Sequence, residues 1–495
     1  MHILAIDQGT TGSTCLVVAR DGRVVGRGYR EITQHYPAPG WVEHDATELL
    51  TRTVEAAREA IAAAGVTPHA VGITNQRETV VLWDRRTGQP VHRAIVWQDR
   101  RTAARCAELA PEAGRITRLT GLVTDPYFSA TKLEWLLRQP GVAERAERGD
   151  LLAGTVDSWL IWNLTDRAVH ATDYSNASRT MLFDIDGRRW SDELCALFHV
   201  PRSLLPEVRP SSGEFGTVHA RYLGAEVPIA GVAGDQQAAL FGPGCWRPGE
   251  GKNTYGTGAF LLLNGGRERP EAGGGLLATL ACDAAGQPVY ALEAAIFIAG
   301  AAVQWLRDGL GIIGAAAETE ALARGIPSTD GVYFVPALVG LGAPNWEPAA
   351  RGTIVGLTRG STRAHLARAA LEAMAYSTAD VLAVMRARAG GELARGGGTS
   401  LRVDGGATEN GWLMQFQADV LGVPVERPDV VETTALGAAG LAGVATGVWA
   451  SAEEFLAGRR FTRFLPGEGT AAAQAGAAGW ARAVRAALAW ARDGE

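Results

Sequence analysis

Two turns rich in glycine and threonine have the composition of phosphate-binding loops. Residues 7–12 (DQGTTG) follow an apolar strand at the start of the chain, and residues 254–258 (TYGTG) lie near its middle. Glycines let backbone N–H groups crowd around an anion, and threonine hydroxyls add donors. Asp7 adds a carboxylate that can hold Mg²⁺. No Gly-x-x-x-x-Gly-Lys-Ser/Thr loop occurs in the sequence, so the nucleotide interpretation rests on the pair of turns. The alternative for either turn alone is an ordinary β-hairpin.

A third element strengthens the nucleotide interpretation. Residues 401–406 (LRVDGG), followed by an apolar stretch through Trp412, predict a strand, a tight turn and a helix. Such a turn leaves room for a flat adenine ring against glycine backbone, with Asn410 within reach. The order of the three turns resembles the actin-like ATPase fold shared by sugar kinases, actin and the 70-kDa chaperones. The resemblance implies an α/β fold class with two actin-like ATPase (ribonuclease H-like) domains around a central cleft.

The composition is that of a folded protein with two large domains. A chain of 495 residues is too long for one core, and 47% hydrophobic with 20% charged residues is ordinary for a globular protein. We expect a first domain over 1–247 and a second over 248–495. The net charge of -6 argues against a nucleic-acid partner, which would need a basic face.

Cysteine usage and the apolar segments indicate the compartment. The five cysteines form no Cys-x-x-Cys pair, which fits a reducing environment and argues against structural zinc. The chain enters a strand at once, without the pattern of a signal peptide. Its most apolar stretch, 294–306, is too short to span a membrane. We therefore expect a cytoplasmic location and no stable membrane insertion.

Polar residues follow several short apolar strands. Strands are predicted at 3–6, 71–74, 94–97 and 227–232, and a helix at 46–64. Ligands of open α/β sheets gather beyond the carboxyl ends of the strands. The polar residues 75–78 and 234–237 are therefore placed for contact with a ligand.

Asp235 is the candidate general base for phosphoryl transfer to an alcohol. It follows an apolar strand and has no cation beside it in the sequence, and a carboxylate at such a position suits proton abstraction from a hydroxyl. The alternative is a helix N-cap for residues 237–241. The two roles are compatible.

Five further residues have the chemistry of a polyol site. Arg77 and Glu78 present a donor fork and an acceptor at a strand end, with a surface salt bridge as the alternative. Trp97 and Phe260 can wall a short carbon chain, although lone aromatic residues are more often part of a core. A phenol at Tyr127 can donate to a hydroxyl, and its alternative is a loop residue packed on the surface.

Longer motifs extend the resemblance to one family. The chain is similar to the glycerol-phosphorylating members of the FGGY carbohydrate kinase family in four stretches: 7–11 (DQGTT), 39–44 (PGWVEH), 72–79 (GITNQRET) and 234–242 (GDQQAALFG). Residues 127–139 and 352–372 also fit the broader signatures of the family. The similarity runs from about residue 3 to 450.

The resemblance implies ATP:glycerol 3-phosphotransferase activity that yields sn-glycerol 3-phosphate and ADP. It places five residues on the glycerol hydroxyls: Arg77, Glu78, Tyr127, Asp235 and Gln236. Trp97 and Phe260 then contact the glycerol carbons, and Asp235 is the base. The resemblance assigns the phosphate contacts to Thr10, Thr11, Gly12 and Thr257. It assigns the nucleoside contacts to Gly300, Gln304, Gly406 and Asn410. Asp7 holds Mg²⁺ directly or through water.

The resemblance also bears on assembly and regulation. It implies a homo-oligomer, either a dimer or a tetramer. Some bacterial members bind fructose 1,6-bisphosphate through a loop with paired glycines, and members activated by the phosphotransferase system carry a phosphorylatable histidine in that loop. Residues 220–226 (ARYLGAE) have neither feature, and Arg221 stands where that histidine is expected. We expect neither control to operate in its usual form.

Three rival functions remain at this point. A kinase of the same family could act on a ketose or a sugar acid, although Trp97 leaves little room for a longer carbon chain. A non-catalytic ATPase on the same fold would not need Asp235 at a strand end. A sugar-sensing regulator would carry a DNA-binding segment ahead of the first strand.

Overall fold

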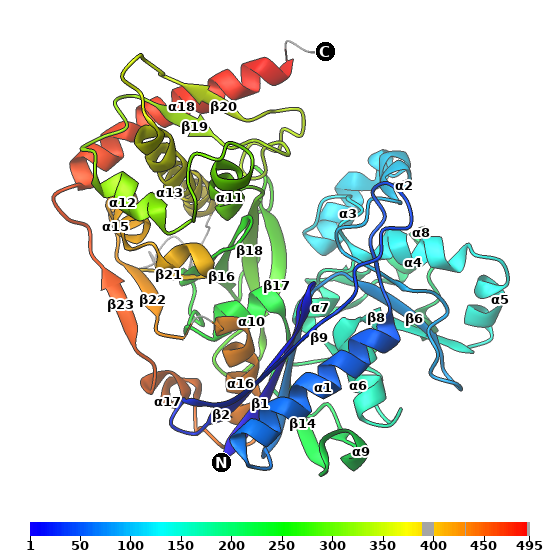
Figure 1. The fold of residues 1–495 in the computed structure, drawn as a ribbon. Helices are drawn as coiled ribbons and strands as arrows, with labels where there is room; N and C mark the ends of the chain where they lie inside the picture. The colour runs from blue at the N-terminus through cyan, green and yellow to red at the C-terminus, as the bar shows by residue number, and fades with distance from the viewer. Residues whose placement is uncertain (389–399, 431, 493–495) are drawn as a thin grey trace. The chain divides into compact units, whose positions relative to one another are not determined.

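The computed structural model of the protein describes residues 1–388, 400–430 and 432–492, which form two compact units (Figure 1). Unit 1 comprises residues 1–246, 278–291 and 433–459, and unit 2 comprises the described residues of 247–277, 292–432 and 460–495. Most of a glycine- and arginine-rich loop that the sequence predicts at 387–399 lies outside the described residues.

The main sheet of unit 1 places three parallel strands side by side. In spatial order its strands are β13 (Thr217–Val218), β14 (Val227–Gly234), β5 (Ala70–Asn75), β1 (His2–Gln8), β2 (Gly12–Ala19) and β3 (Val24–Glu31). Both β1 and β14 run parallel to β5, whereas β2 and β3 continue the sheet as antiparallel hairpins. Gln8 and Gly234 both pair with Asn75. The carboxyl ends of the three parallel strands therefore meet at one edge.

The helix predicted at 46–64 has clear start and stop signals. The side chain of Asp45 accepts hydrogen bonds from the backbone of Thr47 and Glu48, and Gly65 ends the helix in the left-handed region at φ 63°. The helices of unit 1 include α1 (Ala46–Ala64), α4 (Ser129–Leu137), α6 (Val156–Leu164), α7 (Tyr174–Ala177), α10 (Asp235–Phe241) and α16 (Thr433–Ala445).

Alternate residues of β5 face different layers of unit 1, as the two-residue period of a strand requires. Val71 and Ile73 belong to a buried apolar cluster that includes Leu49 of α1. A Cβ atom on Gly72 would instead lie 2.1 Å from the carbonyl oxygen of Ala438 in α16. Glycine at this position therefore lets α16 pack directly on the strand.

A smaller antiparallel sheet in unit 1 carries further site loops. Its strands, in spatial order, are β4 (Glu43–His44), β7 (Ala94–Ile95), β6 (Val80–Asp84) and β8 (Leu151–Thr155). The strand predicted at 94–97 is shorter than expected, because the chain turns after Val96 and the backbone N–H of Asp99 bonds to the carbonyl of Val96. Trp97 consequently lies in a turn.

Unit 2 repeats the arrangement of a hairpin beside a parallel strand. Its strands include β16 (Ala259–Gly266), β15 (Gly251–Tyr255), β21 (Leu401–Asp404), β22 (Val425–Pro428) and β23 (Phe461–Phe464), in this spatial order. β15 and β21 are parallel, and Thr254 pairs with Asp404. The second glycine turn and the Asp-Gly-Gly turn therefore lie at the same edge of the sheet.

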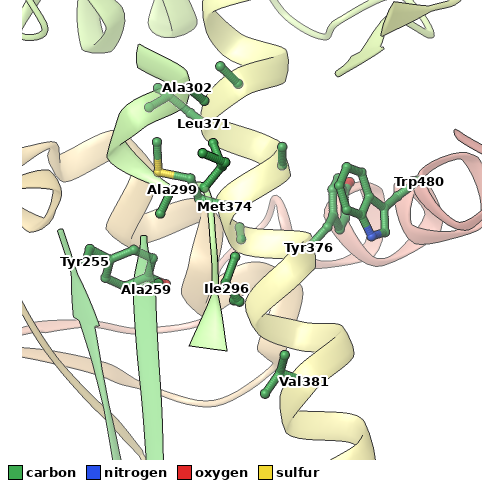
Figure 2. Close-up of a cluster of buried hydrophobic side chains, with 14 of the residues drawn as sticks. Tyr255, Ala259, Ile296, Ala299, Ala302, Leu371, Met374, Tyr376, Val381 and Trp480 are labelled. Atoms are coloured by element: carbon green, nitrogen blue, oxygen red, sulfur yellow. The ribbon is translucent and has the colours of Figure 1, made fainter. Parts of the chain in front are cut away.

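The long helix α13 (Arg363–Arg388) forms the centre of the unit 2 core. Figure 2 shows Leu371 and Met374 pointing from this helix toward the segment that carries Ala302 of α11 (Gly300–Asp308). Farther along α13, the ring of Tyr376 stacks on Trp480 with centroids 5.9 Å apart. Trp480 belongs to α18 (Thr470–Arg492), a helix rich in alanine and arginine.

These two units, each with a mixed sheet, confirm the predicted α/β fold class with two domains. Segments 278–291 and 433–459 pack with unit 1, although they follow residue 247 in the sequence. The domain limits 1–247 and 248–495 remain a proposal. Among the described residues, no helix combines the length and the apolar composition that crossing a membrane requires.

Candidate functional site

The parallel strands of unit 1 bring three charged site residues to one sheet edge. Asp7 lies near the end of β1, Arg77 follows β5, and Asp235 follows β14. The Nε atom of Arg77 lies 3.1 Å from Oδ1 of Asp235. The side chain of Asp235 is 31% exposed, so the carboxylate can still reach a ligand. The structure therefore joins residues that the sequence placed only at separate strand ends.

Asp235 is the first residue of α10, and Gly234 occupies the N-cap position without a side-chain bond. The N-cap alternative for Asp235 therefore does not apply, although its Oδ1 accepts a hydrogen bond of 2.7 Å from the backbone of Gln236. A carboxylate in the first turn of a helix interacts favourably with the helix dipole. Gln236 is partly exposed beside it.

Arg77 and Glu78 are buried, which excludes the surface salt bridge as their explanation. Both side chains are 2% exposed, and Arg77 Nη1 donates to Oε1 of Gln237 at 3.3 Å. Glu78 has φ 62°, a left-handed conformation that is strained for a residue with a side chain. The hydroxyl of Ser129 donates to the Glu78 carbonyl at 3.0 Å and helps to hold this conformation.

Arg179 is a site residue that sequence reasoning missed. Its Nε donates to Oε1 of Glu78 at 2.6 Å, and its guanidinium lies 5.5 Å from the centroid of the Tyr127 ring. The side chain is fully buried. The only sequence signal was an arginine within the polar run 172–180 (TDYSNASRT), which the chain buries almost entirely.

Trp97 and Tyr127 form a partly exposed aromatic wall. Their ring centroids lie 5.6 Å apart with an edge-to-face angle of 66°. The indole Nε1 of Trp97 donates to the hydroxyl of Thr10 at 2.9 Å. Both rings are only partly buried, so neither belongs to the core of unit 1. Phe260, the other predicted wall residue, lies in β16 of unit 2.

The first glycine turn is a closed hairpin between β1 and β2. The backbone N–H of Gly9 donates to the carbonyl of Gly12 at 2.9 Å, and Thr11 at the tip is exposed. A Cβ atom on Gly12 would lie 2.5 Å from the carbonyl oxygen of Arg30, so glycine is required there for packing. Thr10 and Thr11 thus remain the donors available from the tip of the turn.

Asp7 has the properties of a magnesium ligand. Burial raises its pKa to about 7, and the negative charge of Asp235 adds to this effect. A divalent cation bound there would stabilise the buried carboxylate of Asp7 and offset its repulsion from Asp235. Mg²⁺ commonly uses one or two carboxylates together with substrate phosphates. Among the described residues, no three His, Cys, Asp or Glu side chains gather as a separate metal site. The donor set therefore fits Mg²⁺ bound jointly with a phosphate chain.

Unit 2 contains a cavity of about 580 Å³ that has the dimensions of a nucleoside site. Five residues predicted to contact the nucleotide line it together: Thr257, Gly300, Gln304, Gly406 and Asn410. Sequence reasoning missed its apolar floor, which is formed by Leu371 and Met374 of α13. Leu371 lies within the family stretch 352–372, but neither residue was assigned to the nucleotide. Glu320 of α12 (Glu318–Arg324) adds a carboxylate to the lining.

Backbone bonds hold the second glycine turn against the start of α11. The N–H of Gly300 donates to the carbonyl of Gly256 at 3.0 Å, and the N–H of Ala301 donates to that of Thr257 at 3.0 Å. Gly256 and Thr257 are themselves exposed. The turn is therefore fixed in place while its tip stays accessible.

The Asp-Gly-Gly turn uses its two glycines differently. Gly405 has φ 88°, and a Cβ atom there would lie 2.3 Å from the carbonyl oxygen of Tyr255. A Cβ atom on Gly406 would meet nothing within 4 Å. Gly405 is therefore needed for the turn, whereas Gly406 leaves open space in the cavity. Asn410 caps α15 (Gly411–Leu421) through a 2.9 Å bond from the N–H of Leu413, and its amide also lines the cavity.

Known families and relatives match the chain over most of its length. The N-terminal domain of the FGGY family of carbohydrate kinases matches residues 2–242, and the C-terminal domain of the same family matches residues 251–446. The chain is 54% identical to a glycerol kinase of Halorhodospira halophila, over 100% of this chain and 98% of the relative. It is also 54% identical to a glycerol kinase of Symbiobacterium thermophilum, over 99% of each.

Among solved structures, the fold is similar to that of Plasmodium falciparum glycerol kinase with ADP, with a TM-score of 0.92 and 35% identity over 98% of both chains. A xylulose kinase from Brucella ovis gives a TM-score of 0.86 and 26% identity over 99% of both. The matches to both family domains and to full-length relatives lead to one conclusion: the chain belongs to the FGGY family of carbohydrate kinases.

Proposed function

We propose that this protein transfers the γ-phosphate of ATP to glycerol, giving sn-glycerol 3-phosphate and ADP, the first step of glycerol catabolism. Full-length relatives at 54% identity that are glycerol kinases support the substrate. The single observation that carries the chemistry is the pair Asp235 and Arg77, whose Oδ1 and Nε atoms lie 3.1 Å apart at the ends of two parallel strands.

Asp235 acts as the general base in this proposal. Its carboxylate accepts the proton of the attacking glycerol hydroxyl as the oxygen forms a bond to the γ-phosphorus and the bond from that phosphorus to the β–γ bridging oxygen breaks. Arg77 orients the carboxylate from one side, and the side chain of Asp235 remains 31% exposed. The bridging oxygen leaves as part of ADP, and the hydroxyl proton stays on Asp235.

The remaining hydroxyls of glycerol are shared between donors and acceptors. We assign an acceptor role to the buried carboxylate of Glu78 and donor roles to Gln236 and Tyr127. The aromatic wall of Trp97 with Tyr127 supports apolar contact with the short carbon chain. Phe260 is proposed as a second contact for the carbons.

The nucleotide is proposed to lie with its adenosine in the unit 2 cavity, beside Gly300, Gln304, Gly406 and Asn410. Thr10, Thr11 and Gly12 donate to the phosphates from one turn, and Thr257 donates from the other. Asp7 would hold Mg²⁺ with the phosphates, directly or through water, and a metal ion there neutralises charge on the transferring group. Exclusion of water from the closed site would favour transfer to glycerol over hydrolysis.

Assembly and location are part of the same proposal. We expect a cytoplasmic homo-oligomer, a dimer or a tetramer, with glycerol as its small-molecule partner and with no nucleic acid. Light scattering coupled to size-exclusion chromatography measures the native mass, and a mass equal to that of one chain would contradict the expected assembly.

The experiment is ADP release from MgATP with a panel of acceptors: glycerol, dihydroxyacetone, xylulose, ribulose and gluconate, with a control lacking acceptor. We expect strong turnover on glycerol and little on the five- and six-carbon compounds. Preference for a sugar would retain Asp235 as base but overturn the pocket assigned to Arg77, Glu78 and Trp97. Release of ADP without any acceptor would favour an ATPase.

A further inference from the structure

A ring of hydrogen bonds behind the active edge of unit 1 connects the first glycine turn to the aromatic wall. The amide Nε2 of Gln34 donates to the carbonyl of Thr10 at 2.7 Å, and its Oε1 lies 2.9 Å from Nε2 of His44. On the other side of the imidazole, Nδ1 of His44 lies 3.4 Å from Nε2 of Gln76. His44 thus joins two amide side chains that approach it from opposite sides.

The ring closes through Thr79 and Trp97. The hydroxyl of Thr79 donates to Oε1 of Gln76 at 2.9 Å, and it accepts from the backbone N–H of Trp97 at 3.2 Å. The indole Nε1 of Trp97 donates to the hydroxyl of Thr10 at 2.9 Å, which closes the ring. The turn proposed for phosphate contact and the residue proposed for the glycerol carbons therefore share one continuous network.

The direction of every bond in the ring is determined by its neighbours. The Nε2 of Gln34 is committed to the Thr10 carbonyl, so Oε1 of this amide faces His44 and must accept. The Nε2 of Gln76 donates toward Oε1 of Gln8 at 3.0 Å and also lies 3.3 Å from the carbonyl of Gly9, while its Oε1 accepts from Thr79. This nitrogen therefore presents only N–H groups to Nδ1 of His44. His44 must therefore donate from Nε2, and a proton on Nδ1 would face a group that cannot accept it, so the arrangement fits a neutral imidazole with its proton on Nε2.

The surroundings of His44 support the neutral form. The side chain is fully buried, and burial lowers its pKa to about 4, with a further contribution from the charge of His35. The neighbouring carboxylate of Glu43 is already paired with Arg101, at 2.8 Å, and does not accept from the imidazole in the structure. Gln76 and Thr79 are also buried, and polar networks in such an environment are stabilising when every member is satisfied.

We propose that His44, as the neutral Nε2–H tautomer, is a positioning residue. It holds the phosphate turn at Thr10 and the glycerol wall at Trp97 in a fixed position relative to each other. The proposal rests on the proposed function for the roles of those two residues. Because Gln76 directly precedes Arg77, the same network also holds the start of the 77–78 turn. Loss of either His44 bond should weaken binding of both substrates together.

The tautomer is measured first, on the full-length protein without substrates. Two-bond ¹H–¹⁵N spectra of the ¹⁵N-histidine-labelled protein distinguish the two neutral tautomers and the imidazolium, and His44→Asn identifies the signal. We expect a proton on Nε2 and none on Nδ1 at pH 7. A proton on Nδ1, alone or in an imidazolium, would overturn the proposal whatever the protein phosphorylates.

Two variants then cut the ring on opposite sides. His44→Asn retains an acceptor near the Nδ1 position and loses the donor to Gln34, whereas His44→Gln retains the donor and loses the acceptor for Gln76. We expect each to raise KM for glycerol and KM for ATP by roughly tenfold, the size of one buried hydrogen bond, with a smaller effect on kcat.

His170 provides the matched control. It is another histidine of unit 1 whose pKa burial lowers to about 4, and its Nε2 bonds to the carbonyl of Ala153 at 2.9 Å, away from the ring. We expect His170→Phe to lower Tm while both KM values stay unchanged. If the His44 variants lower Tm in the same way but leave both KM values unchanged, His44 is structural and the proposal is wrong.

Discussion

The Nε atom of Arg77 lies 3.1 Å from Oδ1 of Asp235. Arg77 follows β5, and Asp235 begins α10 directly after the neighbouring parallel strand β14. The guanidinium is buried and is held on its other side by Oε1 of Gln237 at 3.3 Å. A cation fixed in this way orients the carboxylate without occupying all of its acceptor sites. The side chain of Asp235 is thus held by the protein while 31% of it stays exposed.

Asp235→Asn tests the general base. An amide has the shape of the carboxylate but cannot accept the hydroxyl proton, so we expect kcat to fall by about 10²-fold or more. ADP affinity, measured by titration calorimetry, should be nearly unchanged because the adenosine cavity lies in unit 2. Asp21→Asn, at an exposed turn, serves as the control. Near-normal turnover of Asp235→Asn would remove this residue from the chemistry.

Trp97→Ala tests the wall of the glycerol pocket. Removing the indole opens space beside a short polyol and breaks the 2.9 Å bond to Thr10. We expect KM for glycerol to rise by roughly tenfold or more and discrimination against longer acceptors to weaken. The acceptor panel measures both effects. Unchanged selectivity would mean that the ring only fills space in the fold.

Asp7→Asn tests the raised pKa of Asp7 through the pH dependence of stability, and it tests the role of Asp7 in catalysis through kcat. The folded-state pKa of Asp7 is raised from 3.8 to about 7, so between these values the folded protein retains a proton that the unfolded chain has lost. The free energy of unfolding therefore falls with rising pH in this window, by at most about 1.4 kcal/mol per pH unit from this group.

Asp7→Asn has no carboxyl group at this position, so its free energy of unfolding does not fall with rising pH for this reason. Without Mg²⁺ we expect Asp7→Asn to be more stable than the parent at pH 8, with the difference vanishing below about pH 4, while kcat in MgATP falls. Denaturant titrations at several pH values measure the first effect. Equal stability of parent and variant at pH 8 would contradict the raised pKa.

Gly405→Ala and Gly406→Ala form a matched pair. At Gly405 a Cβ atom would collide with the Tyr255 carbonyl and would also require a left-handed alanine, so we expect a loss of roughly 2 kcal/mol or more in stability. At Gly406 the new methyl group meets only open space in the cavity. We expect unchanged Tm and a several-fold higher KM for ATP. A KM equal to that of the parent would place adenosine elsewhere.

Lys132→Arg tests whether this buried position requires lysine in a chain that otherwise uses arginine almost everywhere. Of its 47 lysine and arginine residues only Lys132 and Lys252 are lysines, and both are buried. The Nζ atom of Lys132 donates to the carbonyl of Tyr127 at 2.6 Å, and burial lowers its pKa to about 8. A guanidinium is too large for this space.

We expect Lys132→Arg to lose about 1–3 kcal/mol of stability, as overpacked cores do, and to raise KM for glycerol through displacement of Tyr127. Chemical denaturation and steady-state kinetics measure the two effects. The exposed exchange Arg23→Lys should change stability by less than about 0.5 kcal/mol. If Lys132→Arg behaves like this control, the buried site tolerates either cation.

Local structure followed directly from the sequence. The helical pattern over 46–64 predicted α1 with both of its ends, and Asp45 and Gly65 cap those ends in the structure, because helix formation and capping depend on near neighbours in the chain. The apolar runs before residues 7, 75 and 234 predicted strands with polar ends, since a strand buried on both faces must be apolar along its length. The family, the fold class and a candidate list of site residues could therefore be obtained without a structure.

The tertiary structure alone decided which of these residues act together. Arg179 reaches Glu78, and His44 joins Gln34 to Gln76, through contacts between segments far apart in the chain, which leave no spacing pattern. Segments 278–291 and 433–459 join unit 1 for the same reason. Sequence by itself determined the turns, strands and chemical groups, because these depend on local conformational preference. Packing of distant segments decided burial, pairing and protonation, because these depend on neighbours that only the folded chain supplies.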